Sequence, residues 1–275
     1  MRCRPGYGVR RASVMMLIDA HAHLDRYGEL LSAAVKEIED KSILTVSNSM
    51  DFASYRRNLA IGKECSLVVP TFGVHPKNAP GSVSELTTFG AAIDQTPMIG
   101  EIGLDFHWVR DSAQYPAQKR VLEYFLAAAR EQRKIVNLHT KGAEKEVLVL
   151  LERYGVQRAI VHWYSGPVDI LRAMIAAGFY FTIGVEVLFS DTTKEIARLI
   201  PLGQMLTETD NPGGLKWLNG SSGMPSAIDD VIRVGAEIKT LDSLSFADSV
   251  RANWERLTRG DLWLDGVRKQ TALAH

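Results

Sequence analysis

The sequence predicts one α/β domain folded as a (β/α)₈ TIM barrel, and three observations lead to this prediction. Eight short apolar runs succeed one another along the chain, helical patterns lie between them, and polar side chains stand where many of the runs end. Alternation of strands and helices implies parallel strands with crossover helices, and eight such units favour closure into a barrel. The alternative is an open, doubly wound sheet. No GxGxxG or GxxxxGKS/T motif follows the first run, which weakens the nucleotide-binding form of that alternative.

The expected strands are short and rich in Val, Ile, Leu and Phe. They span residues 16–19, 43–46, 67–73, 98–103, 135–138, 159–161, 179–183 and 205–207. Helices are expected where apolar residues recur at a period near 3.6 or where good helix formers cluster, at residues 121–133, 147–154, 170–177, 227–238 and 244–257. Gly178 is a plausible stop for the third of these helices. Residues 213–223 are rich in glycine and predict a loop.

Composition limits the class of protein. The 275 residues are 46% hydrophobic, as in a globular protein, and carry no formal net charge. Proteins that coat nucleic acid usually carry an excess of Lys and Arg, so contact with a nucleic acid would be local, at a metal site or a small cationic rim. Cys3 and Cys65 form neither a disulfide framework nor a CxxC motif, which indicates a reducing compartment and predicts the cytoplasm of a bacterium. No apolar run is long enough to span a bilayer, so no membrane partner is expected.

Three segments are expected along the chain. Residues 1–14 are rich in Arg and Gly and lack the apolar stretch of a secretory signal. They are interpreted as a disordered leader or as the product of a wrongly chosen start, because Met15 and Met16 follow at once. The barrel is expected over residues 15–260, and residues 261–275 are expected to be a C-terminal tail.

Ligand-type side chains lie at or just after the ends of the predicted strands, except Glu101, which lies within the fourth. They are His21, His23, His75, Glu101, His139, His162 and Asp210. In a barrel of this kind the chemistry lies at the carboxyl ends of the strands. His21 and His23 are two residues apart, and such residues point to the same face of a strand. Each residue alone has a structural explanation, such as a core histidine or a salt-bridged carboxylate. Their joint placement is difficult to attribute to chance.

This mixed set of imidazoles and carboxylates predicts a metal centre. It suits zinc, manganese, iron or magnesium chemistry, and four histidines with two carboxylates are enough for two ions. Glu101 is the natural bridge, with one oxygen toward each ion. Asp210 is placed to bind metal and also to accept a proton from water. A two-metal site can lower the pKa of a shared water and stabilise the oxyanion that forms.

Six segments together resemble the ordered motifs of the TatD family of metal-dependent hydrolases, many of which are deoxyribonucleases, within the amidohydrolase-like barrels. They are residues 18–25 (IDAHAHLD), 72–76 (FGVHP), 99–105 (IGEIGLD), 137–141 (NLHTK), 161–166 (VHWYSG) and 208–212 (ETDNP). The resemblance runs from residue 16 to about 257, and Asn253 resembles a late Asn of the family.

The resemblance implies a role for each ligand. His21 and His23 would hold the first ion with Asp210, Glu101 would bridge, and His139 and His162 would hold the second. Two divalent ions, Mg²⁺, Mn²⁺ or Zn²⁺, would activate water, with Glu101 and Asp210 as catalytic groups. The implied substrate is DNA, either single-stranded or at 3′ ends, cleaved as a phosphodiester by a 3′–5′ exonuclease.

Substrate contacts are less sharply indicated. The candidates are His75, Lys141, Trp163, Tyr164 and Lys216, with Asp105 as an orienting carboxylate. Lys141 stands where the family often has Arg, and it lacks the planar fork of Arg. Trp163 and Tyr164 would stack on a base or pack at a strand end. Leu122, Phe125, Asn211 and residues 213–225 depart from the family pattern.

These departures keep two alternatives open. The first is an ester or amide hydrolase, such as an aminoacyl-tRNA deacylase. The second is a hydrolase that works as a subunit beside protein partners, for example in an anti-phage defence assembly.

Overall fold

The computed structural model describes residues 15–261, so the predictions for residues 1–14, for the tail beyond residue 261 and for Cys3 lie outside the described residues. Eight strands are present: β1 (Leu17–Ala22), β2 (Ile43–Asn48), β3 (Val68–Thr71), β4 (Ile99–Gly103), β5 (Val136–His139), β6 (Ala159–Val161), β7 (Tyr180–Ile183) and β8 (Met205–Thr207). Every strand pair is parallel. Each of the predicted strands is therefore confirmed.

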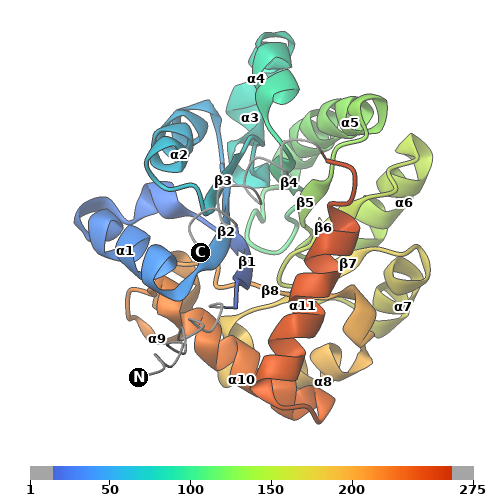
Figure 1. Ribbon diagram of the computed structural model, residues 1–275. Coiled ribbons are helices and arrows are strands. Elements are labelled where there is room, and N and C mark those ends of the chain that lie inside the picture. Colours follow the sequence, from blue (N-terminus) through green and yellow to red (C-terminus); the bar gives the residue numbers. More distant parts are fainter. Residues whose placement is uncertain (1–14, 262–275) are drawn as a thin grey trace, which may run out of the picture.

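The strands form a ring. They pair in the order β1-β2-β3 and β4-β5-β6-β7-β8. A parallel bridge between Phe72 and Ile99 joins β3 to β4. On the other side, the backbone N–H of Asp210, just beyond the end of β8, donates to the carbonyl of His21 in β1 at 2.8 Å. Figure 1 shows the helices arranged around these central strands. The prediction of a TIM barrel is confirmed.

The helices occupy the connections between the strands and follow β8. They are α1 (Leu31–Lys41), α2 (Phe52–Glu64), α3 (Ala79–Ser82), α4 (Gly90–Gln95), α5 (Tyr115–Gln132), α6 (Glu144–Tyr154), α7 (Val168–Ala176), α8 (Asp191–Leu199), α9 (Gly213–Asn219), α10 (Ile228–Lys239) and α11 (Ser243–Leu257). All five predicted helices are confirmed as α5, α6, α7, α10 and α11. Gly178 follows α7 with a φ of 84°, a left-handed conformation that glycine adopts without steric cost.

The prediction of a loop over residues 213–223 is wrong for its first half, which forms α9. Two glycines lower helix propensity, but packing outweighs them here. A Cβ on Gly214 would lie 2.4 Å from the carbonyl oxygen of Thr209, so this glycine permits close contact between the helix and the end of β8. Leu215 and Leu218 pack against the main core. Tertiary contacts have therefore overridden local propensity.

None of the helices in residues 15–261 is long and apolar enough to cross a membrane. One large core fills and surrounds the barrel, and a smaller cluster lies beneath α1 and α2. The smaller cluster contains Cys65, which is buried as a free thiol.

Helix α11 (red in Figure 1) lies across the amino-terminal end of the ring, opposite the predicted site. Its Asn253 donates hydrogen bonds to the carbonyls of Leu202 and Met205, at 2.6 and 2.8 Å. Met205 begins β8, so this side chain ties the helix to the base of the barrel. Asn253 therefore stabilises the packing of α11 against the barrel and lies away from the predicted site.

We expect Asn253→Ala to destabilise the fold and leave metal binding unchanged. The substitution removes the donor from two carbonyls, which costs about 1–3 kcal/mol. The melting temperature should fall by roughly 2–4 °C for each kcal/mol. Thermal melting and metal titration on the same preparation test this. A loss of metal affinity in the folded variant would contradict it.

Candidate metal centre

Six of the predicted ligand side chains converge at the carboxyl end of the barrel. They are His21 in β1, His23 just after it, Glu101 in β4, His139 at the end of β5, His162 after β6 and Asp210 after β8. Parallel strands bring these distant positions to one end of the ring. All are buried except Asp210, whose side chain is 21% exposed.

One carboxylate oxygen of Glu101 faces the first ligand set. Its Oε2 lies 3.7 Å from His21 Nε2 and 3.4 Å from His23 Nε2. Asp210 Oδ1 completes the group, at 3.8 and 3.3 Å from the same two nitrogens. The donor atoms of His21, His23 and Glu101 lie close enough together to hold one metal ion, and Asp210 Oδ1 lies against the two histidine nitrogens.

The other oxygen of Glu101 faces the second ligand set. Oε1 lies 3.0 Å from His139 Nδ1 and 3.0 Å from His162 Nε2. His75 Nε2 is farther away, at 3.6 Å. The two oxygens of one buried carboxylate thus face two separate groups of nitrogen donors.

The donor set fits divalent cations. Glu101 Oε2 is buried and has no hydrogen-bond partner among residues 15–261. A buried carboxylate oxygen left unpaired is costly, and a bound cation removes that cost. Burial raises the pKa of Glu101, but hydrogen bonds from His139 and His162 outweigh it and hold this pKa well below its usual range. The buried cluster is therefore able to bind a metal ion.

His21 and His23 are oriented by partners outside the cluster. The Nδ1 atom of His21 lies 2.9 Å from Asn137 Oδ1, and that of His23 lies 2.9 Å from the carbonyl of Asn48. Both partners are acceptors, so each Nδ1 carries a proton and each Nε2 presents its lone pair to the centre. Asn137 is itself held, because its amide donates to the carbonyl of Ala20 at 2.8 Å.

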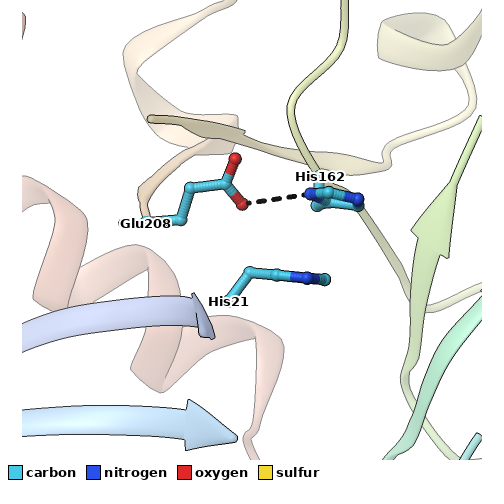
Figure 2. Close-up of side chains that lie close together, drawn as sticks. All are labelled: His21, His162 and Glu208. Carbon is cyan, nitrogen blue, oxygen red and sulfur yellow. Dashed lines mark ion pairs between the residues drawn. The ribbon is translucent and has the colours of Figure 1, made fainter. Parts of the chain in front are cut away.

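His139 and His162 have carboxylate partners. Asp105 Oδ2 lies 3.0 Å from His139 Nε2, which matches the orienting role expected for Asp105. Glu208 Oε2 lies 3.6 Å from His162 Nδ1, and the ring of His21 stacks on that of His162 with centroids 3.8 Å apart. Figure 2 shows Glu208 facing His162, with His21 beside it. Burial opposes a charged His162, but Glu101 and Glu208 outweigh it and raise its pKa to about 10.

Glu208 belongs to the site but was not predicted from the sequence. It is fully buried, and neither of its carboxylate oxygens has a hydrogen-bond partner among the described residues. The available signal was its position directly after β8, two residues before Asp210. A carboxylate at such a point is costly unless a cationic group faces it.

His75 differs from the other histidines. Its Nδ1 accepts a hydrogen bond from the backbone N–H of Lys77 at 3.1 Å. Burial lowers the pKa of His75 to about 3, so the ring is neutral and its proton lies on Nε2. Although His75, Glu101 and His139 lie close enough to form a metal-binding group, this tautomer makes His75 Nε2 a donor toward the pocket. We therefore favour a substrate contact for His75.

A pocket of about 1060 Å³ opens over the centre, and most of the predicted substrate contacts line it. Lys141 lies in its wall, where Nζ donates to the carbonyl of Trp163 at 2.8 Å and to Ser165 Oγ at 2.7 Å. Trp163 also lines the pocket, and its indole N–H donates to Glu186. Lys216 lines it as an exposed cation.

Tyr164 does not line the pocket. It is buried, and its hydroxyl donates to the carbonyl of Pro167 at 2.6 Å. The structure therefore gives Tyr164 the packing role, one of the two roles expected from the sequence. The pocket instead contains Arg26, Trp108 and Trp217, which sequence reasoning did not single out. They lie in connections between the predicted strands and helices, where no periodic pattern in the sequence predicts which way a side chain points.

Gly103 lets β4 and β5 approach closely beside Glu101. Its φ is 155°, and a Cβ at this position would lie 1.9 Å from the carbonyl oxygen of His139. We expect Gly103→Ala to destabilise the fold by about 3 kcal/mol through this clash. Thermal melting tests it, with Gly90→Ala as the matched control, because a Cβ there meets nothing within 4 Å. Equal melting temperatures for the two variants would contradict this prediction.

Comparison with known proteins shows which family the chain resembles. The model of the family described as TatD related DNase matches residues 18–259. An uncharacterized metal-dependent hydrolase of Bacillus subtilis, YabD, is 27% identical over 89% of this chain and 99% of its own length. Deoxyribonuclease Tat-D of Schizosaccharomyces pombe is 28% identical over 69% of this chain and 65% of its own. The structure of YJJV, a TatD homologue from Escherichia coli, superposes with a TM-score of 0.79 at 22% identity, covering 89% of this chain and 98% of that one.

The family match spans nearly the whole described chain. The chain therefore belongs to the TatD family.

Proposed function

We propose that this protein, a metal-dependent hydrolase of the TatD family, holds two divalent ions and cleaves phosphodiester bonds of DNA. The observation that carries the proposal is Glu101, because its two oxygens face two different sets of donors, at 3.4–3.7 Å and 3.0–3.6 Å. Relatives named deoxyribonucleases in Schizosaccharomyces pombe and Homo sapiens support DNA as the substrate.

One ion would be held by His21, His23 and Asp210. The other would be held by His139 and His162, and Glu101 would bind both ions. Mg²⁺, Mn²⁺ or Zn²⁺ so bound would supply charge stabilisation to the phosphate oxygens and acidity to a water. Asp210 is the carboxylate of the centre most open to the pocket. Its Oδ1 faces the two histidines, so its Oδ2 is available to accept the proton of the attacking water.

Other residues position the substrate. Arg26 and Lys216 are exposed at the pocket and can pair with flanking phosphates. His75 presents Nε2–H as a neutral donor beside Glu101. Few cations contribute and the chain has no net charge, so the enzyme would bind a strand end locally and would not coat a duplex. We therefore propose removal of nucleotides from a strand end, which the resemblance to the TatD family implies to be the 3′ end.

A labelled single-stranded oligonucleotide tests the activity and its direction. The strand carries a 5′ label in one reaction and a 3′ label in another, with Mg²⁺, Mn²⁺ or Zn²⁺ added and with chelator as control. A ladder of stepwise shorter 5′-labelled products supports the proposal. Immediate release of the 5′ label as a mononucleotide contradicts the direction. An intact oligonucleotide with every metal contradicts the activity, and hydrolysis of an aminoacyl ester by the same protein would then favour the ester hydrolase alternative.

A further inference from the structure

Two exposed tryptophans meet at the pocket. Trp108 follows β4 and Trp217 lies in α9, and their side chains are 51% and 63% exposed. Their ring centroids are 4.8 Å apart at an interplanar angle of 77°. Both side chains line the pocket that contains Glu101. Exposed apolar side chains that meet in a pocket point to a ligand or partner more than singly scattered ones do.

Both tryptophans are tied to ligands of the metal centre. Asp105 Oδ1 accepts the backbone N–H of Trp108 at 2.7 Å, while its Oδ2 contacts His139. Helix α9 starts three residues after Asp210, and the N–H of Gly214 donates to the carbonyl of Asp210 at 2.7 Å. The metal centre and the tryptophan pair therefore hold a defined position relative to each other.

The surroundings of the pair suit a nucleotide better than a protein surface. Lys216 precedes Trp217 in the chain, Arg26 lines the same pocket, and His107 stands edge-on to Trp108 at 4.4 Å. Aromatic faces beside cations are the combination that binds bases and phosphates of single strands. A protein-docking surface would be a wider apolar patch than two rings among polar neighbours.

We propose that Trp108 and Trp217 form a stacking subsite for an unpaired nucleobase of the strand whose phosphate lies at the metal centre. This inference rests on the proposed action on DNA. A base within a duplex has both faces covered by its neighbours, so only a single-stranded or frayed end can enter the subsite. The pair would therefore select unpaired strand ends, whatever the base.

Binding of two probes tests the subsite without requiring cleavage. One probe is fluorescein-labelled hexathymidylate with phosphorothioate linkages, and the other has the same backbone with every base replaced by a base-free tetrahydrofuran unit. Fluorescence anisotropy gives the Kd of each probe for the wild type, Trp108→Ala, Trp217→Ala and the corresponding Phe variants. Leu244→Ala is the control, because this 68% exposed side chain lies on α11 at the opposite end of the barrel.

Each Ala variant should raise the Kd for hexathymidylate by about 5- to 140-fold, the equivalent of roughly 1–3 kcal/mol for one stacked base. The base-free probe should bind all variants equally, and the Phe variants should bind hexathymidylate nearly as the wild type does. Equal weakening for both probes, or no weakening, would overturn the subsite, as would failure of the wild type to bind hexathymidylate.

The two proposals fail in distinguishable ways. Base-dependent binding that the Ala substitutions abolish, with no cleavage of an ordinary phosphodiester oligonucleotide, would leave the subsite standing and refute the hydrolysis of DNA. Cleavage that is equally fast in the wild type and both Ala variants at low substrate concentration would refute the subsite alone.

Discussion

Replacing Glu101 with Gln should reduce kcat/KM by about 10³-fold or more, because each decade of rate corresponds to about 1.36 kcal/mol and loss of a bridging ligand removes several. Both oxygens of this carboxylate face nitrogen donors at 3.0–3.7 Å. The amide has nearly the same shape, but it carries no charge and offers only one oxygen. Affinity for both ions should therefore fall together with the rate.

Rate and metal content must be measured on the same folded preparation. Glu186→Gln is the matched control, because Glu186 lines the same pocket and accepts the indole N–H of Trp163, and within residues 15–261 it forms no hydrogen bond or ion pair with the candidate metal ligands. Its metal content should equal that of the wild type. If Glu101→Gln retained both ions and a rate within about tenfold of the wild type, the bridging role would be refuted.

Removal of the metal should lower the melting temperature. A ligand present at 100 times its Kd stabilises the fold by about 2.7 kcal/mol, and a chain of this size gains roughly 2–4 °C for each kcal/mol. Chelator should therefore lower the melting temperature by about 5–11 °C for each site emptied from that concentration. The physical reason is that buried carboxylates and imidazoles lose the cation that compensates for their burial.

Calorimetric melting across a series of metal concentrations checks this effect. The melting temperature should rise with the logarithm of free metal once its concentration exceeds the Kd, and metal added back after chelation should restore it. Glu101→Gln should show a much weaker dependence. If the melting temperature of the wild type did not change with metal concentration, the result would argue against ions at this centre.

The strands and the ligand residues were predictable because both depend on local order in the chain. A short apolar run reads as a strand, and a polar residue at its end lies at the carboxyl edge of a parallel sheet wherever the neighbouring strands come from. His21 and His23 also share a strand face because of the two-residue period. For this reason the sequence predicts that six candidate ligand side chains far apart in the chain share one end of the barrel, where the structure brings them together.

Other features of the site depend on pairs of residues that no local pattern relates. Asn137 contacts His21 across 116 positions of the chain, and Glu208 reaches His162 across the end of the barrel. The tautomer of His75 depends on a single backbone N–H, that of Lys77. Such contacts are created by packing, so a one-dimensional pattern contains no signal for them.

The barrel, the order of its elements and the candidate metal ligands could be predicted from the amino-acid sequence, since they follow from periodicity and from side chains at strand ends. The helical conformation of Gly214, the packing of Tyr164 inside and the contact between Trp108 and Trp217 at the pocket depend on tertiary packing. Glycine-rich and irregular segments have weak local preferences, so their conformation is set by the surfaces against which they pack.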